Sequence, residues 1–228
     1  MSNRPIFTKQ GVDMIDLHTH SLLSDGALLP SELVRRAKVK GYKAIAITDH
    51  VDASNIDFVV PRLAKAASHL SRVWKIKVIP GAELTHIPLE DINSLARQAR
   101  QLGAKIVLVH GETIVEPVIP GTNRKALEAD IDILTHPGLI SEEDARLAAK
   151  KNIYLEITTR KGHSLTNGHV AKIAKKAKAK LVLNTDAHAP EDLADIEIAG
   201  KIALGCGLSK QDVKVMFKNS QALVSRVS

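Results

Sequence analysis

Short apolar runs rich in isoleucine and valine alternate with longer segments of helical periodicity along the chain. We predict seven strands from these runs, at residues 12–17, 43–48, 76–82, 104–109, 131–134, 153–158 and 181–184. The runs are nearly unbroken, as expected of strands that are buried on both faces of a parallel sheet. Strands that alternate with helices in this way predict an α/β fold built on a parallel sheet or barrel.

Helix signals lie between the predicted strands. The expected starts are Pro30, Ser141 with Asp144, Pro190, and Ser209 with Asp212, and the expected ends include Gly41 and Gly205. Proline is favoured in the first turn of a helix, serine with an acidic residue three positions later makes a capping box, and glycine follows the last turn. A further helix is predicted over residues 89–102 from its spaced apolar positions. The sequence leaves open whether the last helix, predicted over residues 209–218, serves packing or assembly.

The chain of 228 residues is long enough for one domain with a sizeable core, and no linker or low-complexity tract divides it. We therefore predict a single domain over residues 1–228. The apolar runs are far shorter than the roughly eighteen residues of a membrane-spanning helix, so no membrane partner is expected. The first ten residues lack an apolar signal core and the chain has a single cysteine, which predicts a cytoplasmic protein.

The net charge points to an anionic partner. Lysine and arginine number 32 against 25 acidic residues, which gives +7 and a pI near 9.5. Aromatic residues make up only 3% of the chain, too few for the stacking platforms of single-stranded nucleic-acid binders. A small phosphorylated substrate accounts for the charge as well, so nucleic acid is possible but not favoured. The oligomeric state is not predicted.

Histidine, aspartate and glutamate stand at the ends of the predicted strands. The segments are Asp16-Leu17-His18-Thr19-His20, Thr48-Asp49-His50, Glu83, His110, Thr135-His136, Glu156 and Asp186-Ala187-His188. In α/β barrels, catalytic residues from many strands meet at the carboxyl ends of those strands. We therefore expect these side chains to form one site.

The spacing of these residues predicts metal binding. In His18-x-His20 and Asp186-x-His188, two side chains stand on the same side of an extended backbone, about 7 Å apart. Imidazoles combined with carboxylates favour zinc, manganese or iron, and a carboxylate such as Glu83 can bridge two ions. The other candidate ligands are Asp25, His50, His110 and His136. Asp49 and Glu156 are expected to hydrogen-bond a ligand or the backbone.

The same residues resemble the PHP phosphoesterases, a family named for polymerase and histidinol phosphatase. The resemblance is carried by Asp16-Leu17-His18-Thr19-His20, Ser24-Asp25-Gly26, Ile47-Thr48-Asp49-His50, Glu83, His110, Thr135-His136-Pro137-Gly138 and Asp186-Ala187-His188. It implies a distorted, TIM-like (β/α)7 barrel with two to three divalent ions at the carboxyl ends of its strands. The closest resemblance is to the histidinol-phosphatase-like branch.

The resemblance also implies how the ligands are shared among the ions. The first ion would be held by His18, His20, Glu83 and Asp186; the second by Glu83, His110 and His136; and the third by Asp25, His50 and His188. Every position of this ligand set is filled in the chain.

Clustered divalent ions lower the pKa of a bound water and neutralise phosphoryl oxygens. We therefore predict hydrolysis of a phosphate ester by a metal-bridging hydroxide, with Glu83 as the bridging ligand and with the leaving oxygen protonated by water or by a nearby acid such as Asp49. The histidinol-phosphatase-like resemblance implies a monoester. Substrate contacts are expected from loops after the fourth and sixth strands. The candidate residues are Arg124, Arg160, Lys161 and His163.

Three other functions remain open. An amidohydrolase also begins with His-x-His on its first barrel strand, but its bridging residue usually falls on the fourth of eight strands. A phosphodiesterase or exonuclease would use the same metals on nucleic acid or nucleotides. A non-catalytic scaffold would bind metal without turnover, although the filled ligand set argues against it.

Overall fold

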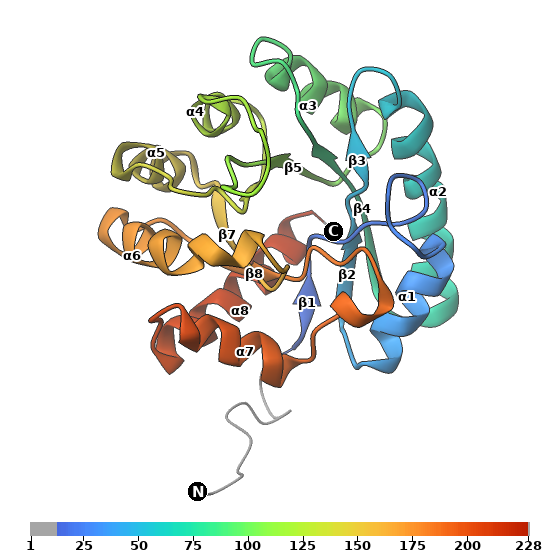
Figure 1. Cartoon of the computed structure of the whole chain (residues 1–228). Helices are drawn as coiled ribbons and strands as arrows, with labels where there is room; N and C mark the ends of the chain where they lie inside the picture. Colours follow the sequence, from blue (N-terminus) through green and yellow to red (C-terminus); the bar gives the residue numbers. More distant parts are fainter. Residues whose placement is uncertain (1–12, 228) are drawn as a thin grey trace, which may run out of the picture.

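The computed structural model describes residues 13–227 and contains a parallel sheet that curls into a barrel surrounded by helices (Figure 1). The strands are β1 (Ile15–Asp16), β2 (Ala44–Ile47), β3 (His50–Val51), β4 (Lys77–Leu84), β5 (Ile106–His110), β6 (Ile133–Thr135), β7 (Tyr154–Thr158) and β8 (Leu181–Asn184). Seven of them follow the order β1-β2-β4-β5-β6-β7-β8, and β3 pairs with β4 beside this path. The predicted distorted (β/α)7 barrel is confirmed.

Helices connect nearly all neighbouring strands along the chain. They are α1 (Pro30–Val39), α2 (Ile56–Trp74), α3 (Ile92–Gln101), α4 (Thr122–Glu128), α5 (Glu142–Lys151), α6 (Asn167–Ala177), α7 (Ile196–Gly205) and α8 (Lys210–Arg226). The predicted caps are confirmed at α5 and α8, where the hydroxyls of Ser141 and Ser209 accept hydrogen bonds from the backbone N–H groups of Asp144 and Asp212. These connections place the carboxyl ends of the strands at one end of the barrel.

Alternate residues of each strand pack into two separate cores. The larger core joins the outer face of the strands to the helices and includes Ile45, Val107 and Leu155. The smaller core contains the intervening strand residues, such as Ile106 and Leu108, and fills the interior of the barrel. A packed interior leaves the two ends of the barrel for polar groups, and the predicted site residues lie at the carboxyl end of the strands.

The barrel closes between β8 and β1 through side chains as well as backbone. Asn184 Oδ1 accepts a hydrogen bond from Leu17 N (2.9 Å), and the Asp16 carboxylate accepts hydrogen bonds from the backbone and hydroxyl of Thr185. Thr19 and Ala187 then form an isolated parallel bridge. This seam brings the two metal-ligand motifs, at the ends of β1 and β8, side by side.

The structure corrects four details of the sequence prediction. It has an eighth strand, the two-residue β3, because the chain turns at the polar Thr48-Asp49 pair and then pairs again with β4. Pro190 begins a short 3-10 helix, and the α-helix starts only after Asp195, whose carboxylate caps it. The first predicted strand shortens to β1, with Val12 outside the described residues, and the last helix extends to Arg226.

The last helix serves packing. Val213, Met216, Phe217 and Leu223 are buried, and Leu223 belongs to the core inside the barrel. This helix therefore covers the amino end of the barrel, opposite the strand ends that carry the predicted site. Within residues 13–227, no helix combines the length and apolarity needed to span a bilayer.

Candidate metal centre

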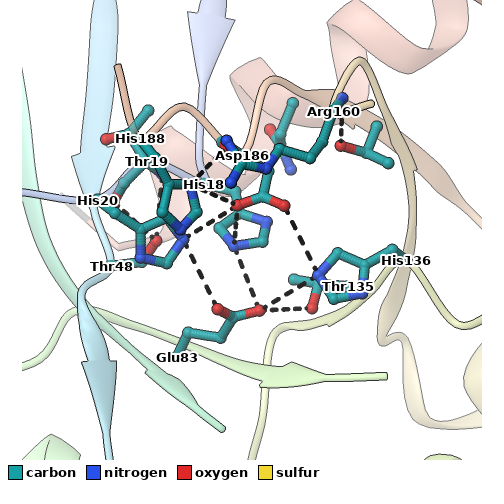
Figure 2. Close-up of polar contacts among 12 residues, drawn as sticks. His18, Thr19, His20, Thr48, Glu83, Thr135, His136, Arg160, Asp186 and His188 are labelled. Carbon is teal, nitrogen blue, oxygen red and sulfur yellow. Dashed lines mark hydrogen bonds and ion pairs between the residues drawn. The ribbon is translucent and has the colours of Figure 1, made fainter. Parts of the chain in front are cut away.

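The predicted ligands from opposite sides of the barrel converge on Glu83, near the end of β4 (Figure 2). His18 Nε2 lies 3.2 Å from Glu83 Oε1, and His50 Nδ1 lies 2.9 Å from Glu83 Oε2. His20 Nε2 lies 3.2 Å from Asp186 Oδ1. Thr135 Oγ1 donates a hydrogen bond to Glu83 Oε1 (2.7 Å) and fixes the central carboxylate.

The ligand atoms form five overlapping groups, each with its atoms within 4.8 Å of one another. The groups are His18-His20-Asp186, His18-Glu83-His136, His20-Asp25-His50-His188, His110-His136-His163 and His86-His110-Glu116. The first group contains three of the four ligands predicted for the first ion, without Glu83, and the third contains the set predicted for the third ion together with His20. The set predicted for the second ion is divided, because Glu83 and His110 share no group.

The backbone is strained where it presents several of these residues. His86, His136 and Asp186 have positive φ angles of 53°, 22° and 53°, a region that residues other than glycine rarely adopt. The other non-glycine residues with positive φ between 13 and 227 follow the ends of α2, α5 and α6, where this conformation is ordinary. Strain outside helix ends is therefore concentrated at the metal-ligand cluster, as is common at functional sites.

Glu156 of β7 orients two of the histidines. Its Oε1 lies 2.9 Å from His18 Nδ1 and accepts a hydrogen bond from Asn184 Nδ2, and its Oε2 accepts one from the backbone of His136 (3.1 Å). A hydrogen bond at one ring nitrogen fixes the imidazole so that the other nitrogen can bind a metal. The predicted supporting role of Glu156 is confirmed.

The buried polar atoms of the cluster fit bound cations. Both ring nitrogens of His20, and Nε2 of His18, are buried without a hydrogen-bond partner, as are Nδ1 of His110 and Nδ1 of His136. Leaving a buried polar group without a hydrogen bond costs about 1–3 kcal/mol. A cluster of such atoms therefore indicates a site where a bound ligand supplies the missing contacts. The donor set of imidazoles and carboxylates suits zinc, manganese or iron.

The protonation states favour ligation as well. Burial lowers the pKa of His20 and His136 well below the usual value, which leaves lone pairs on their rings. Burial raises the pKa of Glu83, but the neighbouring His18 and His50 outweigh it and hold that pKa well below normal. Burial also raises the pKa of Asp186 to about 7, so a nearby cation is needed to keep this carboxylate fully ionised at neutral pH.

Asp49 is turned away from the cluster. Its carboxylate accepts hydrogen bonds from Ser21 N (2.6 Å), Ser21 Oγ (2.7 Å) and Ser24 Oγ (2.7 Å). These contacts fasten the loop that carries Asp25. In the same loop, a Cβ on Gly26 would lie 2.4 Å from the carbonyl oxygen of His20, so only glycine fits. The structure thus gives Asp49 a positioning contact and does not bring it to the ligands as an acid.

The structure separates the four predicted substrate contacts. Arg160 lines the site cavity and its guanidinium contacts Asp192 (3.0 Å). His163 is buried among the histidines, and Lys161 is exposed over a neighbouring hollow. Arg124 lies on α4, where it pairs with Glu143 (2.8 Å) and Asp144 (2.6 Å), because α4 already begins at Thr122.

Glu116 is a site residue that the sequence prediction missed. It lies in the loop between β5 and α4, with Oε2 3.1 Å from His110 Nε2 and 3.3 Å from His86 Nε2, and Oε1 3.3 Å from His163 Nε2. The hydrogen bond with His110 lowers the pKa of Glu116 to about 2. Its position depends on the path of an irregular loop, so no periodic signal marks it.

These residues surround a cavity of about 240 Å³ at the carboxyl end of the barrel. The lining residues are Asp25, His50, Thr85, His86, His110, Glu116, Arg160, His163, Asp186 and His188. Among them Arg160 is the one arginine or lysine. A larger cavity of about 710 Å³ lies at the amino end, but the metal-ligand groups are all at the smaller one.

Comparison with known proteins identifies the family. Residues 16–130 match the model of the PHP domain. An uncharacterized protein of Methanocaldococcus jannaschii, MJ1295, is 50% identical over 87% of this chain and 92% of its own length. A probable phosphatase of Shewanella halifaxensis is 28% identical over 83% of each chain. A Bacillus subtilis DNA polymerase/3'-5' exonuclease, PolX, is 28% identical over 80% of this chain and 35% of its own.

Solved structures share the fold. A chain in the structure of archaeal ribonuclease P with mature tRNA has a TM-score of 0.72 at 19% identity and covers 93% of this chain and 90% of its own. Histidinol phosphate phosphatase from Lactococcus lactis, complexed with zinc, L-histidinol and phosphate, has a TM-score of 0.62 at 20% identity, over 86% and 94% of the two chains. The family match supports the PHP prediction over the amidohydrolase alternative. The chain belongs to the PHP domain family of metal-dependent phosphoesterases.

Proposed function

We propose that this protein hydrolyses a small phosphate monoester with the help of two to three divalent ions. The nine residues His18, His20, Asp25, His50, Glu83, His110, His136, Asp186 and His188 would hold the ions. The probable phosphatase of Shewanella and the histidinol phosphate phosphatase with its bound zinc and phosphate support this proposal.

Bound divalent ions would supply a water that ionises near neutral pH and positive charge for the phosphoryl oxygens. The chain's own residues hold the ligand side chains in position. Glu83 supplies a central carboxylate held by Thr135, and Glu156 fixes the rings that face it. Burial keeps bulk water from competing at these groups.

The position of Arg160 in the site cavity is the main support for a phosphate substrate. Its guanidinium lines the same cavity as Asp186 and His188 and lies beside the cluster in Figure 2. The contact from Nη1 to Asp192 holds the side chain in place, and arginine offers phosphate a bidentate grip. A cavity of about 240 Å³ suits a phosphate with a small leaving group better than a polynucleotide.

Cleavage of nucleic-acid diesters is the second candidate. The net charge of +7 favours it, and PolX is named as an exonuclease. The exposed Lys161 beside Arg160 would then contact the phosphate backbone outside the cavity.

The test is release of phosphate from a panel of monoesters, including histidinol phosphate and nucleotides, beside an aryl diester and single-stranded DNA. Protein loaded with manganese or zinc is compared with His18→Ala and with His69→Ala, a matched control on the exposed side of α2. We expect monoester hydrolysis that His18→Ala abolishes and His69→Ala retains. Turnover of the diesters alone would refute the monoesterase and favour the nuclease. Metal binding without any turnover would support the scaffold.

A further inference from the structure

Glu116 and His163 lie outside the nine ligand positions, yet they contact the metal-site histidines. They come from two loops, one after β5 and one after β7, and both line the site cavity. Glu116 bridges His110 and His163 through its two oxygens, at 3.1 and 3.3 Å. His163 stacks on His136 with ring centroids 4.2 Å apart.

His163 adopts the same arrangement as His18. In His18, Nδ1 is held by Glu156 at 2.9 Å and Nε2 lies near two carboxylates, Glu83 and Asp186, at 3.2 and 3.5 Å. In His163, Nδ1 lies 2.8 Å from Thr113 Oγ1, and Nε2 lies near Glu116 and Asp186 at 3.3 and 3.8 Å. One nitrogen held from behind and the other directed at carboxylates is the usual arrangement of a metal-binding histidine.

The distances fit the shell of an ion. Ligand atoms about 2.0–2.1 Å from a tetrahedral zinc lie roughly 3.3 Å from one another. The oxygens of Glu116 lie 3.1 and 3.3 Å from the nitrogens of His110 and His163. Donor nitrogens of His110, His136 and His163 lie within 4.8 Å of one another.

The loop that carries Glu116 is fastened at its base. Glu112 Oε1 accepts hydrogen bonds from Gly121 N (3.0 Å) and Asn123 N (2.8 Å), and Asn123 Nδ2 donates to the carbonyl of Pro137 (2.9 Å), next to His136. Gly138 lies so close to this loop that a Cβ would overlap the carbonyl oxygen of Glu112. The loop is therefore built against the His136 segment, and the position of Glu116 is tied to it.

We propose that Glu116 and His163 supply ligands, beside His110, to one divalent ion of the zinc, manganese or iron class. Glu116 would add a carboxylate on the side of His110 that faces the cavity mouth, while Glu83 stays grouped with His18 and His136. The inference rests on the metal-dependent function proposed above, but it concerns binding and not turnover.

The test measures metal binding directly. Metal-free protein is titrated with cobalt, whose absorption reports each ion bound, and the zinc content after equilibration is measured by mass spectrometry. The variants are Glu116→Gln, His163→Gln and Thr113→Val, with Glu128→Gln on α4 and His169→Gln on α6 as matched controls. Thermal unfolding shows whether each variant is folded. Because Glu116 is part-exposed, Glu116→Gln is expected to fold, and it can still test the inference if His163→Gln unfolds.

We expect Glu116→Gln and His163→Gln each to lower the affinity for one ion by at least about tenfold. Thr113→Val should lower the affinity for the same ion about tenfold, as for other residues that orient ligands. The remaining ions and both controls keep wild-type affinity. Unchanged affinity for every ion in Glu116→Gln and His163→Gln would overturn the inference, and a rise in KM alone in His163→Gln would make His163 a substrate contact instead. If the variants lose an ion while the wild type hydrolyses no phosphoester, the site stands and the proposed activity fails.

Discussion

Glu83 at the carboxyl end of the barrel and Asp132 near its amino end are both buried carboxylates, but their surroundings differ. Asp132 accepts hydrogen bonds from Val107 N (2.8 Å), from Arg100 (2.9 Å) and from Arg226 of α8. Glu83 is surrounded instead by the imidazoles of His18, His20, His50 and His136. Asp132 is paired with arginines, which stay protonated, whereas Glu83 is surrounded by imidazoles, which can also bind metal ions.

The difference separates structural from functional polar groups. At the amino end, Arg100 and Arg226 neutralise the buried charge of Asp132, and the neighbouring α8 completes the core. At the carboxyl end, buried nitrogens of His18, His20, His110 and His136 have no hydrogen-bond partner, and three residues have strained backbones. Protein groups alone satisfy the polar atoms of the first end, whereas the unpartnered nitrogens of the second fit bound cations.

The largest effect is expected from Glu83→Gln. If Glu83 is the shared ligand proposed above, its loss removes several kcal/mol of charge stabilisation, which corresponds to about 10³-fold in rate. We expect phosphoester hydrolysis to fall by at least this factor and the content of bound zinc to drop. Retention of both in a folded variant would contradict the role of Glu83.

Asp132→Asn should lower the stability of the fold and leave metal binding unchanged. The change removes the charged partner of Arg100 and Arg226, and hydrogen bonds to a charged group contribute about 1.5–3 kcal/mol; we expect the low end because both arginines reach solvent. We expect a lower free energy of unfolding in urea, with unchanged metal content and unchanged KM. Addition of zinc should raise the melting temperature of this variant and of the wild type by the same amount, but that of Glu83→Gln by less. A loss of bound metal in Asp132→Asn would show that the two ends are not independent.

The site could be predicted from sequence where a ligand is fixed by a strand. Glu83 lies in β4, and His18, His20, Asp186 and His188 follow β1 and β8 within four residues, so barrel geometry brings them to one end. The extended backbone expected of Asp186-x-His188 is not observed, because Asp186 has a φ of 53°. The serine caps of α5 and α8 were equally predictable, because they depend on residues three positions apart, although only α8 forms the full capping box. Local rules and barrel topology therefore account for most of the fold and of the inner ligand cluster.

Residues in loops could not be placed in the same way. Glu116 reaches the histidines only through the path of its loop, and the Asp49 carboxylate accepts hydrogen bonds from Ser21 and Ser24 of a neighbouring loop. Arg124 was expected in a loop, but α4 begins before it and directs it to Glu143 and Asp144 on the outside. These outcomes depend on competition among side chains that no spacing in the sequence records.

Asp16 offers a third buried carboxylate, held by the neutral donors of Thr185 and by the backbone of His18. Burial raises its pKa from 3.8 to about 6, so the folded state binds a proton more tightly than the unfolded chain. Its contribution to stability is therefore present below pH 4 and is lost as the pH rises to about 6. The unfolding free energy of Asp16→Asn relative to wild type should rise by up to about 3 kcal/mol over that interval. A flat difference between pH 4 and pH 7 would contradict this.

Glu156→Gln should lower the metal affinity of the site without abolishing metal binding. The amide can still accept from Asn184 or from the backbone of His136, but it no longer offers His18 a charged partner. Loss of such an orienting residue costs about 10–100-fold in metal affinity or activity. Zinc competition with a chelator of known affinity would measure this. An unchanged zinc affinity would show that the ring of His18 needs no carboxylate behind it.

The smallest effect is expected from Asp49→Asn. The amide oxygen can still accept from the backbone of Ser21 and from Ser24 Oγ, and its NH2 group can donate to Ser21 Oγ, so the loop that carries Asp25 keeps its position. We expect hydrolysis to fall less than about threefold, whereas loss of a general acid would cost about 10²-fold or more and change the basic limb of the pH profile. Asp49→Ala, which removes all three contacts, should instead release the loop and weaken the ion held by Asp25, His50 and His188. A large loss of rate in Asp49→Asn with full metal content would restore Asp49 as the acid, and would mean that its carboxylate leaves both serines during the reaction.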